Sequence, residues 1–287
     1  MNAPRSLPSP PTELPPYDPN EERRRFFERL ILATALPGVA GAVNASGFLA
    51  VGTYTSHVTG LVGRFGDELA QGRATSAWPA LGLVGLFLVG AITATGLVER
   101  ARRLAKARYV APLLLECGVL ASFALWASAH PGSAGFTLTG LLCFAMGLQN
   151  ALVTKISGAV IRTTHLTGIT TDIGIELVRC YGWIRDELRR ERSLHQSYAL
   201  GRSLLGGQEW KRLRLHLVVF SSFLSGAVLG PELFLAFGQW AMIAPCLTLI
   251  LLAGFDLALG IRGATEPRVT PPPAPEATVI PLGAGRR

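Results

Sequence analysis

The chain has 287 residues, of which 49% are hydrophobic and 16% charged, and its formal net charge is +8 at pH 7. So little charge for this length, together with a positive mean hydropathy, argues against a soluble globular protein and predicts lipid as the main solvent. The basic excess does not predict a nucleic-acid partner, because the basic residues cluster between apolar runs, where they orient a membrane protein.

Neither a metal site nor a secretory signal follows from the sequence. The four cysteines lie within or beside apolar segments and have no metal-binding spacing, so we expect them to behave as small hydrophobic residues. The first twenty residues are rich in proline and lack the apolar core of a signal peptide. We therefore expect the first spanning helix to direct insertion, and we expect no metal and no cofactor.

Six apolar runs of about twenty residues can each cross a hydrocarbon core of about 30 Å as a helix. They are residues 30–51, 78–98, 110–129, 134–153, 217–237 and 242–261. A basic juxtamembrane segment at 21–29 precedes the first run. The proline-rich tails at 1–20 and 263–287 are expected to be disordered.

The basic clusters predict the orientation of these six spans. A six-span topology places the clusters at 21–29, 99–108 and 180–216 on one side, so the positive-inside rule puts both termini in the cytoplasm of a bacterial inner membrane. We expect 180–216 to be a solvated cytoplasmic loop. The alternative is that parts of it lie on anionic lipid.

One stretch of the sequence occurs twice. SHVTGLVGRFGDEL at 56–69 aligns without gaps with THLTGITTDIGIEL at 164–177. Self-similarity of this kind indicates that the fold contains an internal structural repeat. The first copy is too charged to cross a membrane alone, and thirteen helical residues cover only about 20 Å, so we expect a half-helix or a surface helix.

The duplication extends into the flanking helices. GAVNA at 41–45 resembles GLQNA at 147–151, and the run at 78–98 shares its Phe-Leu and Gly-Ala pairs at 87–91 with the run at 217–237, where they lie at 223–227. The halves 30–130 and 134–262 each contain three crossings, an odd number, so they are inverted. We therefore expect an all-α polytopic membrane protein with six transmembrane helices in two inverted three-helix repeats. Each repeat has a short broken or re-entrant helix, whose amino-terminal ends converge near the midplane.

The segments VNASGFLAVGTYTSHVTGLVG and MGLQNALVTKISGAVIRTTHLTG, with their spacing, resemble the YoaK-type family of bacterial inner-membrane proteins, a domain of unknown function. The resemblance covers about residues 30–262. It implies a polytopic membrane protein, sometimes described as a permease, with no established substrate. Two positions depart from the family: Asn44 and Leu61 stand where it commonly has aspartate and asparagine. Since Asn44 cannot titrate, ion coupling at this position is in doubt.

The polar residues of the repeat are the predicted lining of a solute pathway. They are Asn44, His57, Thr59, Gly60, Asn150, His165, Thr167 and Gly168. Other roles remain open: the histidines as hydrogen-bonding residues at helix starts, the threonines as caps, the glycines as packing sites and the asparagines as interhelical bonds. No nucleotide-binding motif accompanies them, so we expect gradient-driven passage of a small polar or anionic solute.

Glu116 and Asp256 are candidate intramembrane charges, because they lie in apolar runs. The alternative is pairing with basic residues at the cytoplasmic boundary. A second possible function is a scaffold or lipid-binding protein that acts through 180–216. A membrane enzyme is the least supported, since no nucleophile, metal cluster or acid-base pair is evident. The expected partners are the bilayer and its anionic lipids, and a homo-oligomer is left open.

Overall fold

The computed structural model describes residues 19–104, 107–132, 135–157, 166–190 and 208–261, and all regular structure in these ranges is helical. Five stretches there are long and apolar enough to cross a membrane, and the last of them, Trp210–Leu259, contains two helices. The chain is thus an all-helical, multi-pass membrane protein, as predicted. The tails that we expected to be disordered lie almost entirely outside the described residues.

The helices occur close to the predicted positions. In chain order they are α1 (Pro19–Val51), α2 (Val58–Ala70), α3 (Ala74–Arg100), the 3-10 helix η1 (Ala101–Arg103), α4 (Val110–Ala129), α5 (Phe136–Ser157), α6 (Leu166–Arg190), α8 (Gln208–Phe237), the 3-10 helix η3 (Gly238–Met242) and α9 (Ile243–Leu259). The basic segment 21–29 continues directly into α1 as one helix.

The segment 180–216 differs from the predicted solvated loop. Residues 180–190 belong to α6 and residues 208–216 to α8, while 191–207 lie outside the described residues. The physical reason is helix propensity: this end of α6 closes with RDELRR at 185–190, where arginine, glutamate and leucine are all good helix formers. Its polarity removed the hydropathy signal that marks a membrane span, but it did not prevent helix formation.

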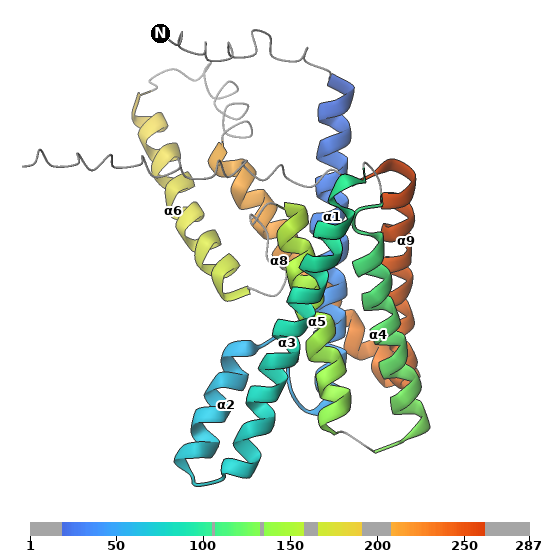
Figure 1. The fold of residues 1–287 in the computed structure, drawn as a ribbon. Helices are drawn as coiled ribbons and strands as arrows, with labels where there is room; N and C mark the ends of the chain where they lie inside the picture. The colour runs from blue at the N-terminus through green and yellow to red at the C-terminus, as the bar shows by residue number, and fades with distance from the viewer. Residues whose placement is uncertain (1–18, 105–106, 133–134, 158–165, 191–207, 262–287) are drawn as a thin grey trace, which may run out of the picture.

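The helices pack in pairs around a shared apolar core. α1 packs along α8, α3 along α5 and α4 against α9, while α2 contacts α3 and α6 contacts α8. Figure 1 shows α2 and the first turns of α3 projecting from one end of the bundle, and α6 with the start of α8 projecting from the other. The main buried core is formed largely by α1, α4, α5 and α9.

Glycine allows the two longest pairs to cross closely. A Cβ atom at Gly41 of α1 would collide with the carbonyl oxygen of Phe223 in α8, and a Cβ atom at Gly147 of α5 would collide with that of Phe87 in α3. Small residues at such crossings let helix backbones approach each other, which is how helices associate in a membrane. These two crossings fix the helices that carry the candidate site.

Candidate functional site

Asn44 holds the loop between α1 and α2 against α1. Its Oδ1 atom accepts hydrogen bonds from the backbone N–H of Ser56, at 3.1 Å, and from the Ser56 hydroxyl, at 3.0 Å. Gly52, at φ +74°, lets the chain leave α1. Asn44 is buried, and through these bonds it positions the start of α2.

His57 is the residue that precedes α2. It makes no side-chain hydrogen bond to the first turn of the helix, whose leading N–H groups have no intrahelical acceptor. Gly60 lies directly beneath the imidazole ring, because a Cβ atom there would collide with the His57 Nδ1 atom. Leu61, one turn after His57, is buried together with Leu83 of α3, and this packing holds α2 against α3.

The starts of α2 and α6 open into one cavity of about 750 Å³. We call it the central cavity. It is lined by Ser56, His57, Val58 and Thr59 at the start of α2, Phe87, Ala91 and Thr95 of α3, Asn150, Ala151, Thr154 and Lys155 of α5, and Thr167 and Gly168 at the start of α6. The two copies of the repeated stretch, far apart in sequence, thus contribute to the same space.

Most of the predicted pathway residues lie at this cavity. Its lining includes His57, Thr59, Asn150, Thr167 and Gly168. Gly60 lies under the ring of His57, and Asn44 acts through Ser56. His165 lies outside the described residues. A role for these residues in solute passage stays a prediction.

Lys155 is a lining residue that the sequence analysis missed. Its Nζ atom lies 3.1 Å from Oε1 of Glu99, in the last turns of α3. The predicted helix ended at residue 153, so Lys155 was left in the connecting segment. In the structure α5 continues to Ser157. Helical spacing then places Lys155 one turn beyond Ala151, on the face that lines the cavity.

Asp256 has a structural role. Its side chain is fully buried, with one oxygen accepting the backbone N–H of Tyr109 at 2.7 Å and the other accepting that of Ile261 at 2.8 Å. It therefore ties the end of α9 to the residue that precedes α4. The expected alternative, pairing with basic residues, is replaced by pairing with backbone amides.

Glu116 is fully buried in α4, and neither of its carboxyl oxygens has a hydrogen-bond partner in the described part of the chain. It does not line the central cavity. An unpartnered carboxyl group inside a protein is costly. Its position agrees with the sequence, which placed a carboxylate within an apolar run.

The repeated glutamate has a different partner in each half. Glu68 of α2 lies 2.6 Å from the Arg73 guanidinium, and this hydrogen bond holds the pKa of Glu68 below its usual value. Glu176 of α6 is buried and lies 3.0 Å from Nδ1 of His216 in α8. The first contact joins α2 to the residue that precedes α3, and the second joins α6 to α8.

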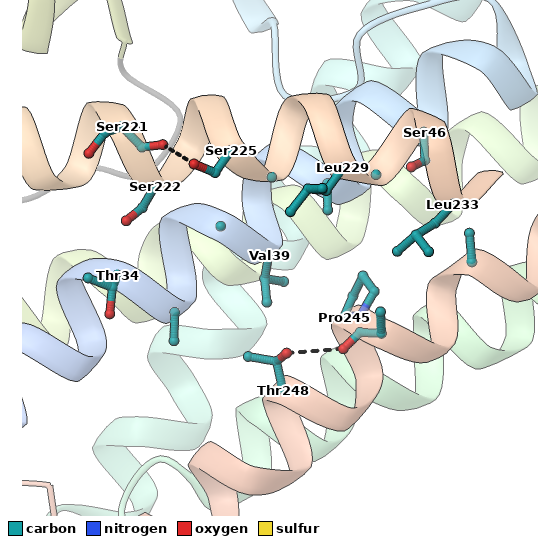
Figure 2. Close-up of a pocket in the computed structure, with 17 residues that line it drawn as sticks. Thr34, Val39, Ser46, Ser221, Ser222, Ser225, Leu229, Leu233, Pro245 and Thr248 are labelled. Atoms are coloured by element: carbon teal, nitrogen blue, oxygen red, sulfur yellow. Dashed lines mark hydrogen bonds between the residues drawn. The ribbon is translucent and has the colours of Figure 1, made fainter. Parts of the chain in front are cut away.

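A second cavity, of about 420 Å³, lies between α1, α8 and α9 (Figure 2). Its lining contains hydroxyl groups but no charged side chain. Ser225 donates to the Ser221 carbonyl oxygen, and Thr248 donates to that of Ala244. Because it has no charged side chain, the second cavity offers an ionic solute less than the central cavity, whose lining includes Lys155.

Comparison with known proteins gives a family and one relative. Residues 32–255 match the family model described as "Protein of unknown function (DUF1275)". The UPF0700 transmembrane protein RA0705 of Rhizobium meliloti (strain 1021) is 27% identical over 231 residues, which cover 80% of this chain and 87% of the relative. No solved structure matches the chain. The resemblance to an uncharacterised family of membrane proteins, noted from the sequence, is confirmed.

Proposed function

Because the chain belongs to the DUF1275 family, whose function is unknown, we propose from its own cavity that it is a gradient-driven membrane transporter or channel for a small polar or anionic solute. The observation that carries the proposal is the central cavity, to which both copies of the repeated stretch contribute. No covalent chemistry forms part of it.

The size and chemistry of the central cavity support this function. Its volume of about 750 Å³ lies within the range of about 300–1,000 Å³ usual for small-molecule sites. Thr59, Thr167 and Asn150 offer hydroxyl and amide groups, while Phe87 and Ala91 supply apolar surface. The uncapped start of α2 adds partial positive charge from its N–H groups. A small polar or anionic solute suits such a lining.

We propose that the solute passes at the interface of two inverted three-helix repeats. Two features support this arrangement. Gly41 meets Phe223 as its counterpart Gly147 meets Phe87, and α2 contacts α3 as α6 contacts α8. The 3-10 helix η3 divides the last apolar stretch into α8 and α9, and the proposed arrangement has each of them cross once, six crossings in all. Inverted repeats with broken helices are common in transporters, where the site lies between the repeats.

The proposed topology, with both termini in the cytoplasm of an inner membrane, predicts a labelling pattern. Gln71 lies exposed at the end of α2, and Ser203 lies in the basic connection between α6 and α8. In a variant without native cysteines, Gln71→Cys should react with an impermeant maleimide added outside whole spheroplasts. Ser203→Cys should react only after lysis. Reaction of both sites from the same side would refute the inverted arrangement.

Uptake into proteoliposomes tests the pathway. The purified protein is reconstituted and offered radiolabelled neutral probes, glycerol and urea, and anionic probes, chloride, formate and inorganic phosphate. Any flux above that of empty liposomes should fall about tenfold or more in Thr59→Val with Thr167→Val. The control is Thr93→Val, because Thr93 is a half-buried residue of α3 whose hydroxyl donates to the Val89 carbonyl oxygen, and it does not line the cavity. Unchanged flux in the double variant would refute the pathway.

A further inference from the structure

We infer that the central cavity selects anions and that Lys155 supplies the binding charge, its ammonium group exchanging Glu99 for the bound anion. This inference rests on the proposed function, because it names the solute class and the binding group of the same cavity.

The charged side chain in the lining of the central cavity is positive. Lys155 carries a full positive charge, and no carboxylate belongs to the described residues that line the cavity. The other described side chains in the lining carry no negative charge. A low-dielectric cleft with charge of one sign concentrates ions of the opposite sign. The central cavity therefore favours an anion over a cation.

Lys155 lies at the end of the cavity that is away from the start of α2. Phe87, Ala91 and Thr95 line the cavity at intervals of one turn along α3, and Glu99 follows one turn later. The cavity thus extends about 12 Å along α3 from Phe87 to Thr95. Because Phe87 packs against the buried cluster that contains Leu61 of α2, the start of α2 lies near the Phe87 end. The Lys155 side chain lies at the other end of the cavity.

The ion pair between Lys155 and Glu99 is accessible enough to be exchanged. The pair keeps 25% of the lysine side chain and 42% of the glutamate side chain exposed, and ion pairs as accessible as this are weak. Glu99 itself does not line the cavity. A lysine ammonium group has three donors on a flexible stem. It can therefore turn toward an anion in the cavity while Glu99 remains solvated.

This arrangement predicts opposite effects for the two partners. Without the Lys155 charge the cavity loses its anion preference. Without the Glu99 charge the ammonium group has one competitor fewer and binds an anion more tightly. A purely structural ion pair would give the same direction for both changes, because either substitution breaks the contact between α3 and α5.

The experiment measures the apparent affinity and rate of uptake of chloride, formate and inorganic phosphate in proteoliposomes, with glycerol and urea as neutral probes. The variants are Lys155→Gln, Lys155→Arg and Glu99→Gln. Lys211→Gln is the matched control, since Lys211 is exposed on α8 and away from the cavity. We expect anion uptake to fall about tenfold or more in Lys155→Gln and to be largely kept in Lys155→Arg and Lys211→Gln. Glu99→Gln should lower the half-saturating anion concentration.

Each outcome bears on the inference separately from the proposed function. Wild-type protein that passes neutral probes but no anion would overturn the inference and leave a transport function standing. Unchanged anion uptake in Lys155→Gln would overturn it as well. Flux no greater than that of empty liposomes, for every probe, would overturn both. If Lys155→Gln does not fold, Glu99→Gln carries the test, and an unchanged or weakened anion affinity there would overturn the assignment.

Discussion

Replacement of Glu116 by methionine is expected to stabilise the protein. The Glu116 side chain is fully buried in α4, on the face that also carries Leu113 and Leu120. Neither carboxyl oxygen has a hydrogen-bond partner in the described part of the chain. Leaving a buried polar group unsatisfied costs about 1–3 kcal/mol. Methionine has a similar volume, no such polar group, and the flexibility to fill an irregular space.

The expected shift is large enough to measure. A change of about 1 kcal/mol moves Tm by roughly 2–4 °C in chains of about 150–250 residues, so Glu116→Met should raise Tm by roughly 2–12 °C. Thermal unfolding of the detergent-purified protein, followed by tryptophan fluorescence, measures it. The matched control is Glu176→Met. Glu176 is also buried, but its carboxylate contacts His216 at 3.0 Å, so its loss should lower Tm.

A fall in Tm for Glu116→Met would refute this reasoning. It would mean that the carboxyl group is satisfied by a bound ion or water, and that the loss of this partner outweighs the gain from apolar packing. A rise in Tm together with lost solute uptake would mean that the carboxyl group serves transport at a cost in stability, as intramembrane carboxylates often do.

Three further predictions follow from the same structure. Asn44→Ala should lower Tm and reduce uptake, because the loop before α2 loses its acceptor, whereas Asn44→Asp, which keeps one, should retain more of both. Gly147→Leu should abolish folding, measured by size-exclusion chromatography, since its side chain would collide with Phe87. The lowered pKa of Glu68 stabilises the protein at pH above its ordinary value of 4.5, and this contribution is lost as the pH falls further. Arg73→Gln should therefore lower Tm at pH 7, and the difference from the wild type should shrink as the pH falls below 4.5.

The spanning helices could be predicted from sequence because a membrane demands long apolar runs. The run at 110–129 coincides with α4, and the run at 30–51 ends with α1 at Val51. The end of α6 could not be found in this way. Residues 178–190 mix apolar with charged side chains, which gives no hydropathy signal, and helix propensity alone only weakly predicts structure.

The candidate site was predicted in part because duplication marks its residues but not their separate roles. Asn44 and Asn150 occupy corresponding positions, yet Asn44 binds the loop before α2, and Asn150 lines the central cavity. Identity within a repeat cannot distinguish these environments, which depend on where the chain turns. Lys155 has no matching residue in the first half, so a search for shared residues passes over it.

Because Lys155 has no counterpart in the first half, we expect the two ends of the central cavity to differ in their affinity for an anion. The alignment that pairs Asn44 with Asn150 places Leu49 opposite Lys155. If the halves were equivalent, a solute would meet the same charge from either side of the membrane. With one lysine at one end of the cavity, an anion should bind with different apparent affinity from the two sides. In proteoliposomes of uniform orientation we expect unequal half-saturating concentrations for influx and efflux of the same anion, and smaller inequality in Lys155→Gln. Equal half-saturating concentrations in the wild type would mean that Lys155 does not make the two ends of the cavity differ in anion affinity, even if it binds the anion.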